Sequence, residues 1–379
     1  MIDPYLRILL YIIFALAVII ILLLLVIITN RYLVSANQAK FRAKKEEWEE
    51  YYLNYLSGDL DLEKAAESIK DEKRYYWLWN FFGPYLDVLD GSDFDKTKAL
   101  CREISLIGHY RQKLQHGTIS EKATAARVLG ALRCKESIAV MISLLDSKHQ
   151  LLVQAAALGL AKSGDRMTFF PVARALLDNT FFTYEGATEI LAAYGKSAAP
   201  LMVRFLEGET ELLPGVAENE NSKSQKKESD PKKVDPSAYS SVMIDLLGFF
   251  KYREALPTLH HLIKEADPET IVHILKAFLS IGEVPVNFDL KPYLEHRYWV
   301  VRNFSARVWK LTGDQRAIPL LKKLLGDRNW WVRFNAAEAL YENGQPGMEI
   351  LRMKAKGSEE DAAAISSYVL SRRGVELQA

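Results

Sequence analysis

The sequence predicts an all-α protein in which one N-terminal transmembrane helix precedes an α-solenoid of about seven helix pairs. Two observations support this prediction. Residues 8–28 form an apolar run without any charge, and later in the chain glycine and proline recur at one fixed interval. A fixed spacing of roughly 20–50 residues is the usual sign of stacked structural repeats. We therefore expect a transmembrane anchor at 1–33, a juxtamembrane helical stalk with an N-terminal cap at 34–117, and a repeat solenoid at 118–379.

Composition and charge narrow the classes of function. The chain has 379 residues, of which 49% are hydrophobic, so it can bury a substantial core. Its 49 basic and 48 acidic residues leave a net charge of +1, which provides no overall field that would attract nucleic acid. Nucleic acid is therefore not an expected partner. The two cysteines, Cys101 and Cys134, are too few for a disulfide framework or a four-cysteine zinc site.

The apolar run at 8–28 has the length of a membrane span. Its 21 residues would extend roughly 30 Å as a helix, which matches the hydrocarbon thickness of a bilayer. A cleaved signal peptide is the rival interpretation, with Val34 to Ala36 as a weak cleavage site, but the apolar region of a signal peptide is usually shorter. The flanking charges set the orientation, because basic residues gather on the cytoplasmic side. Only Arg7 precedes the span, whereas five basic residues follow it: Arg31, Lys40, Arg42, Lys44 and Lys45. We therefore expect a single-pass protein with a cytoplasmic repeat domain.

The segment between the anchor and the repeats should be helical. Residues 38–56 mix charged residues with aromatic ones, which is typical of a helix with one partly apolar face, and Gly58 to Asp61 should end it. A dense aromatic cluster follows between Tyr75 and Phe82. Such rings are typical of membrane interfaces and also of caps over the end of a repeat core. The cap is the interpretation that we favour.

The repeat register follows from positions that lie one fixed step apart. This step equals the distance along the chain from Gly313 to Gly344, and we call it the repeat interval. It connects Gly344, Gly313, Gly282 and Lys251 in one series, and Gly195, Gly164 and Arg133 in another. The two series fall into one register if 25 additional residues separate them. A polar stretch without apolar periodicity at 208–237 supplies these residues and is predicted to be a disordered insertion. A last half-unit ends near Gly374.

Each unit should consist of two antiparallel helices. Glycine provides the left-handed residue that ends the first helix, and proline is tolerated at the start of the second. The prolines in that place are Pro200, Pro257, Pro319 and Pro346. Small residues should mark where neighbouring first helices approach closely, as at Ala125-Ala126, Ala156-Ala157, Ser305-Ala306 and Ala336-Ala337. The second helices carry leucine pairs that should face the core, at Leu144-Leu145, Leu176-Leu177 and Leu324-Leu325.

The repeated string Val-Arg-x-x-Ala-Ala-x-Ala-Leu-x-x-x-Gly, with Ala-Ile-Pro-x-Leu after the glycine, resembles the short HEAT-like repeat first described in phycobilisome lyases. The resemblance covers roughly Thr118 to Gly374, apart from the insertion. The whole layout is similar to bacterial membrane-anchored HEAT proteins of unassigned function, some of which accompany glycosyltransferases in polysaccharide systems. It implies a bacterial inner membrane location. It also implies that Arg302 and Arg333 link adjacent units with acids such as Asp327, whereas arginine is absent at the corresponding positions Gln154, Tyr184 and Ile271.

The sixth and seventh units suggest a surface for binding a partner protein. Tryptophan and arginine dominate binding hot spots, and Trp299 and Trp330 occupy equivalent corners because they lie one repeat interval apart. The alternative is that each ring packs over its own turn. The candidate partner-binding residues are Trp299, Arg302, Trp330, Trp331 and Arg333.

No familiar catalytic or cofactor motif occurs in the chain. His260, His261 and His273 do not form a recognisable metal-binding pattern, because neighbours on one helix point about 100° apart. We therefore expect no metal, no cofactor, no small-molecule substrate and no enzymatic activity. The favoured function is a membrane-tethered scaffold or adaptor for partner proteins that the sequence does not identify. A bilin-lyase-like enzyme would need a chromophore-sized cleft, and a nucleic-acid-binding HEAT protein would need basic residues gathered on the concave face.

Overall fold

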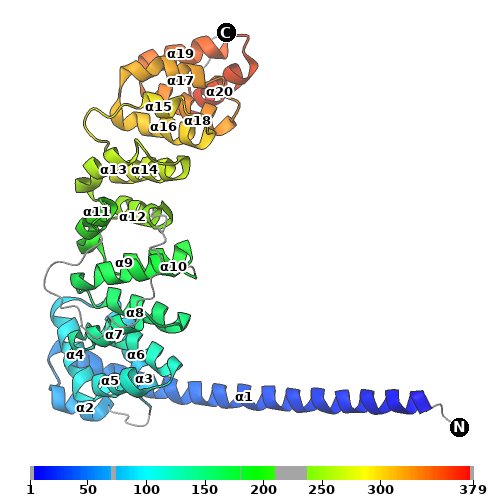
Figure 1. The fold of residues 1–379 in the computed structure, drawn as a ribbon, viewed down its shortest axis with the longest axis vertical. Helices are drawn as coiled ribbons and strands as arrows, with labels where there is room; N and C mark the ends of the chain where they lie inside the picture. The colour runs from blue at the N-terminus through cyan, green and yellow to red at the C-terminus, as the bar shows by residue number, and fades with distance from the viewer. Residues whose placement is uncertain (1–3, 70–73, 180, 210–236, 376–379) are drawn as a thin grey trace, which may run out of the picture. The chain divides into compact units, whose positions relative to one another are not determined.

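The computed structural model describes residues 4–69, 74–179, 181–209 and 237–375. Over these residues the chain consists of helices joined by turns and short loops, without a strand (Figure 1). It divides into two compact units, Met1–Leu132 and Arg133–Ala379. The all-α prediction is confirmed.

Helix α1 (Pro4–Ser57) is a single helix of 54 residues. Among the described residues it is the one helix long and apolar enough to cross a membrane, judged by length and composition. Its described side chains from Ile13 to Val34 are exposed, whereas Trp48 and Tyr52 near its end are buried. Among the described residues of unit 1, the apolar segment from Ile13 to Val34 therefore has no packing partner, and the C-terminal half of α1 continues without interruption as the predicted stalk. The helix ends at Ser57, directly before the predicted break.

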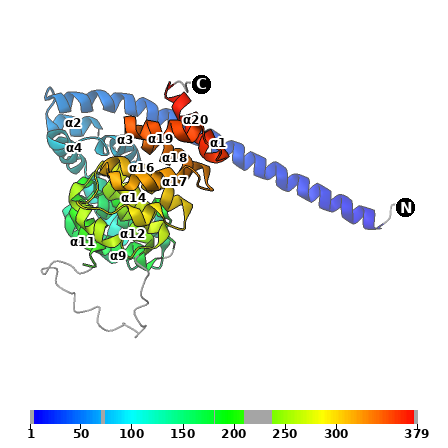
Figure 2. The same ribbon diagram turned by 90° about the horizontal axis from the view of Figure 1, so that it is seen from above.

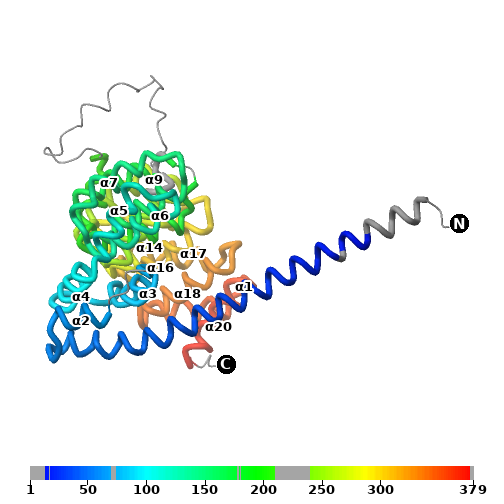
Figure 3. The backbone as a smooth tube through the Cα atoms, turned by 90° about the horizontal axis from the view of Figure 1, so that it is seen from below, coloured from blue at the N-terminus to red at the C-terminus, as the bar shows by residue number. Residues whose placement is uncertain are grey.

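The remaining helices of unit 1 pack around the end of α1. They are α2 (Leu62–Ile69), α3 (Tyr75–Leu86), α4 (Gly91–Glu103), α5 (Leu106–His116) and α6 (Ile119–Ala131). Figure 3 shows α3 beside the C-terminal part of α1. The ring of Phe81 lies 5.8 Å from that of Trp48 and 5.7 Å from that of Tyr52, both edge-on. Three of the six rings of the predicted aromatic cluster, those of Trp77, Phe81 and Phe82, are thus buried in the core of unit 1. Burial in this unit also raises the pKa of the Cys101 thiol.

Unit 2 is a stack of helix pairs. Its helices are α7 (Ile138–Leu144), α8 (Gln150–Lys162), α9 (Phe169–Asp178), α10 (Tyr184–Ala192), α11 (Ala199–Leu206), α12 (Ser237–Phe249), α13 (Leu256–Leu262), α14 (Pro268–Ile281), α15 (Lys291–Leu294), α16 (Trp299–Thr312), α17 (Ile318–Leu324), α18 (Trp330–Glu342), α19 (Gln345–Ala355) and α20 (Glu360–Arg372). From α8 to α20, each first helix packs against the next first helix. Figure 2, seen from above, shows the layers of unit 2 piled over one another. Counted along the chain from α6, the described residues contain seven pairs and the final half-unit α20, so the solenoid prediction is confirmed.

The backbone confirms the predicted repeat register. All seven predicted helix-ending positions, and Gly374 after the last helix, have positive φ. Five of the seven are glycines, whereas Arg133 with φ of 49° and Lys251 with φ of 50° adopt this conformation with a side chain. The four predicted prolines lie in the first turn of α11, α13, α17 and α19. Glycine and proline thus mark the same corner in successive layers.

The predicted small residues lie where helices approach most closely. Each member of the four small-residue pairs is fully buried, with no exposed surface. In the leucine pairs, Leu145, Leu176, Leu324 and Leu325 are buried, whereas Leu144 is only half-buried. The predicted insertion at 208–237 falls almost entirely at 210–236, outside the described residues.

One layer departs from the regular pattern. The second helix of the fifth pair, α15, is only four residues long, and the chain from Glu283 to Leu290 forms a loop before it. Phe288 of this loop is buried and stacks on Tyr293, with ring centroids 5.5 Å apart. The loop therefore contributes a buried aromatic side chain to the core of this layer.

Candidate partner-binding surface

Three tryptophans from two stacked helices lie at the surface of unit 2. Trp299 is the first residue of α16, and Trp330 is the first residue of α18. Their side chains are 41% and 42% exposed, and the neighbouring Trp331 is 55% exposed. The equivalent corners predicted from the spacing are thus confirmed, and the indoles reach solvent. Trp309 of the same helix α16 is instead buried, and its Nε1 donates a hydrogen bond to the Asp314 carbonyl over 2.9 Å.

The ring of Trp330 belongs to a group of aromatic side chains. It stacks on Phe334, one turn further along α18, with centroids 5.2 Å apart and planes at 5°. It also meets Trp331 edge-on at 4.8 Å and Tyr368 of α20 at 6.4 Å. Packing over its own turn therefore holds for Trp330, yet the residue remains 42% exposed. We call Trp299, Trp330, Trp331, Phe334 and Tyr368 the aromatic surface.

Basic side chains border the aromatic surface. The guanidinium of Arg372 lies 5.5 Å from the ring centroid of Phe334, and that of Arg307 lies 5.0 Å from Phe304. Between α16, α18 and α20 is a hollow of about 290 Å³, whose lining includes Arg307, Lys310 and Arg372. Sequence reasoning missed Phe334, Tyr368 and Arg372 as surface residues. The i, i+4 spacing of Trp330 and Phe334 could have revealed one of them.

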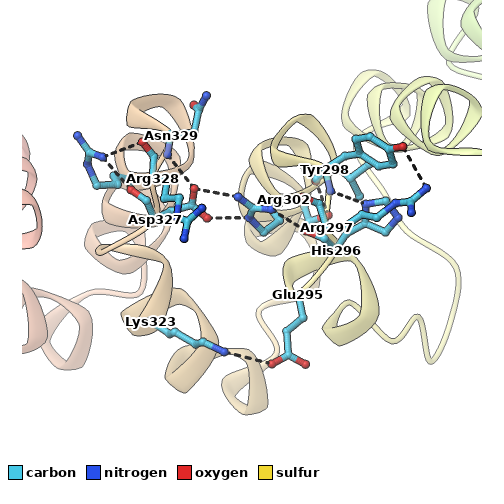
Figure 4. Close-up of polar contacts among 12 residues, drawn as sticks. Glu295, His296, Arg297, Tyr298, Arg302, Lys323, Asp327, Arg328 and Asn329 are labelled. Atoms are coloured by element: carbon cyan, nitrogen blue, oxygen red, sulfur yellow. Dashed lines mark hydrogen bonds and ion pairs between the residues drawn. The ribbon is translucent and has the colours of Figure 1, made fainter.

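Arg302 lies in the junction between two layers (Figure 4). Its Nε and Nη2 donate to both carboxylate oxygens of Asp327 over 2.7 and 2.9 Å, and its Nη1 donates to the His296 carbonyl over 2.7 Å. The two side chains are only 17% and 7% exposed. This bidentate pair ties the start of α16 to the turn before α18, which confirms the link that the resemblance implies.

Arg333 continues the same arrangement in the next layer. Its Nη1 donates to the Asp327 carbonyl over 2.7 Å, and its Nη2 lies 3.1 Å from the Asp361 carboxylate. Its side chain is 12% exposed. Arg302 and Arg333 are therefore committed to contacts within the chain. Of the five candidate residues, the structure gathers the three tryptophans at the surface and places the two arginines beneath them in the junctions.

A different polar cluster joins the layers that lack the arginine. Tyr184 of α10 donates its hydroxyl to Asp245 of α12 over 2.5 Å, and the Nδ1 of His273 of α14 lies 2.8 Å from the other oxygen of Asp245. Burial would raise the pKa of Asp245, but the hydrogen bonds from His273 and Tyr184 outweigh burial and hold this pKa below its usual value. The three residues thus connect three successive first helices. Sequence reasoning did not find this cluster.

The histidines that we considered as metal ligands lie in separate environments. His273 pairs with Asp245, whereas the His260 ring meets Phe288 edge-on at 5.9 Å. Across the described part of the chain, no group of three or more His, Cys, Asp or Glu side chains could hold a metal ion.

Comparison with known proteins gives a match over the C-terminal layers. Residues 289–367 match the family model described as HEAT repeats, and this range contains all five candidate residues. Among solved structures, the chain is similar to the complex of CpcE and CpcF of phycocyanin lyase from Nostoc sp.. That likeness has 19% sequence identity and a TM-score of 0.25, and it covers 70% of this chain and 87% of that chain. No curated protein matches the chain. The helix pairs of unit 2 form a HEAT-like solenoid.

Proposed function

We propose that the chain is a membrane-tethered scaffold that binds a partner protein through the aromatic surface of unit 2. The observation that carries this proposal is the exposure of Trp299, Trp330 and Trp331, which are 41–55% accessible at the corner of two stacked layers. Repeat solenoids commonly present extended binding surfaces, and exposed tryptophans bordered by arginines have the composition of a binding hot spot. The proposal assigns no catalytic step to the chain.

The scaffold role gives the tryptophans and the arginines different tasks. Arg302 joins the layer of Trp299 to that of Trp330 through Asp327, so it helps to set the distance between the two indoles, and Arg333 joins the layer of Trp330 to α20 through Asp361. Rigid positioning reduces the entropy that a surface loses on binding. Binding energy should therefore come mainly from the rings, and the arginines should act through the stability of the junction.

Helix α1 supplies the proposed tether. Its apolar half has the length of a bilayer crossing, and the basic residues after it favour a cytoplasmic position for unit 2. Confinement to a bacterial inner membrane would raise the effective concentration of the scaffold around a membrane-bound partner. A polysaccharide-synthesis system is the setting that we propose from the resemblance to membrane-anchored HEAT proteins.

Crosslinking in native membranes tests the scaffold. The full chain is crosslinked, captured and compared with the Trp299→Ala, Trp330→Ala double variant and with the control Phe249→Ala, which removes a ring that is 74% exposed elsewhere in unit 2. Each hot-spot ring contributes about 2 kcal/mol, so loss of two should lower partner recovery more than tenfold. Equal recovery by all three proteins, or the same loss in the control, would contradict the proposal.

Carbonate extraction tests the tether separately. The full chain should remain in the pellet at high pH, whereas a variant lacking residues 8–28 should be released. An externally added protease should leave unit 2 intact in sealed, right-side-out vesicles. Release of the full chain by carbonate would rule out the membrane span.

A further inference from the structure

We propose that the part of α1 next to the bilayer binds anionic phospholipid headgroups through a row formed by Arg31, Arg42 and Lys45. The inference rests on the proposed membrane anchor and goes beyond it, because it assigns a lipid preference. The three side chains are exposed. We call them the basic row.

Charge is segregated sharply along α1. From Arg31 to Lys45 the helix carries five basic residues and no acid, and four acids follow between Glu46 and Glu50. Clusters of four to eight basic residues beside a membrane span attract anionic lipids by about 1 kcal/mol for each residue near the surface. The basic segment thus lies on the side of the bilayer, and the acidic segment lies further away.

Helical geometry gathers part of this charge on one face. At about 100° per residue, Arg31, Arg42 and Lys45 fall within about 60° of one another around α1. Unit 1 packs against a neighbouring face, since the Phe41 ring meets Trp77 at 5.7 Å and the Trp48 ring meets Phe81 at 5.8 Å. The basic row therefore lies beside the face of α1 that unit 1 covers, and its side chains remain accessible to lipid headgroups.

The continuous helix fixes how far the row lies from the lipids. Arg31 follows the end of the predicted span, at residue 28, by about 5 Å along the helix, which is within the headgroup layer. Arg42 follows it by about 21 Å along the same axis. Because helical side chains lean toward the N-terminus of their helix, we expect the Arg42 side chain to point back toward the surface. Once the headgroup layer and the length of the arginine side chain are subtracted, the gap between the Arg42 guanidinium and the headgroups is close to the Debye length of about 8 Å. An ordinary helix tilt of about 20° toward the row shortens this gap.

Unit 1 presents a compatible edge to the membrane. Helix α3 runs parallel to α1, and its first turn is level with Asn37, whose Nδ2 donates to the Tyr76 hydroxyl over 3.0 Å. Tyr76 is 48% exposed, and the Arg74 guanidinium lies 4.1 Å from the Trp77 ring centroid. Tyrosine and arginine are favoured at the headgroup level. By this proposal the edge and the basic row face the same layer of lipid headgroups.

Lipid co-purification tests this proposal on the full chain. The protein is equilibrated in nonionic-detergent micelles with equimolar phosphatidylcholine and phosphatidylglycerol and then captured, and its bound lipids are quantified by mass spectrometry. We expect bound phosphatidylglycerol to exceed phosphatidylcholine at least threefold at about 0.1 M salt, where screening is moderate. The ratio should approach one at about 1 M salt, because salt screens the attraction.

Two variants with equal loss of charge make the test specific. The variant Arg31→Gln, Arg42→Gln, Lys45→Gln should lose most of the enrichment, whereas Lys148→Gln, Lys264→Gln, Lys356→Gln removes three exposed lysines of unit 2 and should keep it. A ratio of one in the parent protein, or equal enrichment in both variants, would overturn the lipid preference. Resistance to carbonate extraction in the same proteins reports on the anchor alone, so failure of the lipid preference is distinguishable from failure of the tether.

Discussion

Two tryptophans of one helix show how much the environment of a residue decides its role. Trp309 is 3% exposed and has its indole nitrogen hydrogen-bonded, whereas Trp299, at the start of the same helix α16, is 41% exposed. The repeat interval predicted that Trp299 and Trp330 are equivalent, but it did not show that their rings reach solvent. Side-chain exposure depends on the neighbouring layer, and Tyr368 beside Trp330 comes from α20, the next first helix along the chain.

We expect this difference to appear in stability. Replacing Trp309 by alanine should lower the free energy of unfolding by about 3–5 kcal/mol, since it empties a buried site. Replacing Trp299 by alanine should change it by less than about 1 kcal/mol, since most surface substitutions have small effects. Urea unfolding followed by circular dichroism measures both. A large loss for Trp299→Ala would mean that its ring is structural, and it would remove the reason to place it on a binding surface.

At the scale of helices, the junction between layers depends on a buried ion pair. Asp327 accepts two hydrogen bonds from Arg302 and one from the backbone N–H of Asn329 over 2.9 Å. The neighbouring pair of Lys323 and Glu295 is 3.8 Å apart, and its side chains are 76% and 42% exposed. The two pairs bridge adjacent layers but differ in burial.

Asp327→Ala should destabilise unit 2 by about 3 kcal/mol, because it leaves the mostly buried Arg302 guanidinium without a carboxylate and with backbone carbonyls as partners. Glu295→Ala is the matched control and should change stability by less than about 1 kcal/mol, as is usual for an exposed pair. Chemical denaturation of the two variants decides the matter. Equal effects would show that the Arg302 contact does not hold the layers together.

The helix-ending residues give a second prediction at this scale. Gly282 has φ of 88°, and a Cβ built there would meet nothing within 4 Å, so alanine would be strained only through its backbone. Gly282→Ala should therefore destabilise unit 2 by about 1 kcal/mol. Lys251 holds the same place with φ of 50°, so Lys251→Gly should not destabilise and could stabilise by a few tenths of a kcal/mol. A lower unfolding midpoint for Lys251→Gly than for Gly282→Ala would contradict this interpretation of the spacing.

The elements were largely predictable because their boundaries depend on local chemistry. Glycine and proline act through φ and through a missing N–H, so their spacing gave all seven helix-ending positions. The cluster of Tyr184, Asp245 and His273 was not predictable in this way. Its members contact one another across three layers, and the predicted insertion separates Tyr184 from the other two along the chain. The short helix α15 was missed because the position of Gly282 predicts where the first helix ends but not how long the following loop is.

For the whole molecule, the two units divide the proposed work. Unit 1 buries part of its aromatic cluster against α1, so the apolar half of this helix is joined to the folded part through a continuous helix and a core. Unit 2 supplies the layered helices and the aromatic surface. A solenoid of this kind gains its stability from contacts between neighbouring layers. Residues on its exposed edge are therefore available for binding a partner.

Site-specific photocrosslinking in native membranes is the most direct measurement of this scaffold role. A photoreactive phenylalanine derivative is placed at Trp331, which is 55% exposed on the aromatic surface, and in a second protein at Leu151, which is 43% exposed on α8. We expect a discrete crosslinked protein band from position 331 that is absent from position 151 and that disappears when residues 8–28 are deleted. No crosslinked product at position 331, or the same products from both positions, would contradict a tethered scaffold that works through this surface.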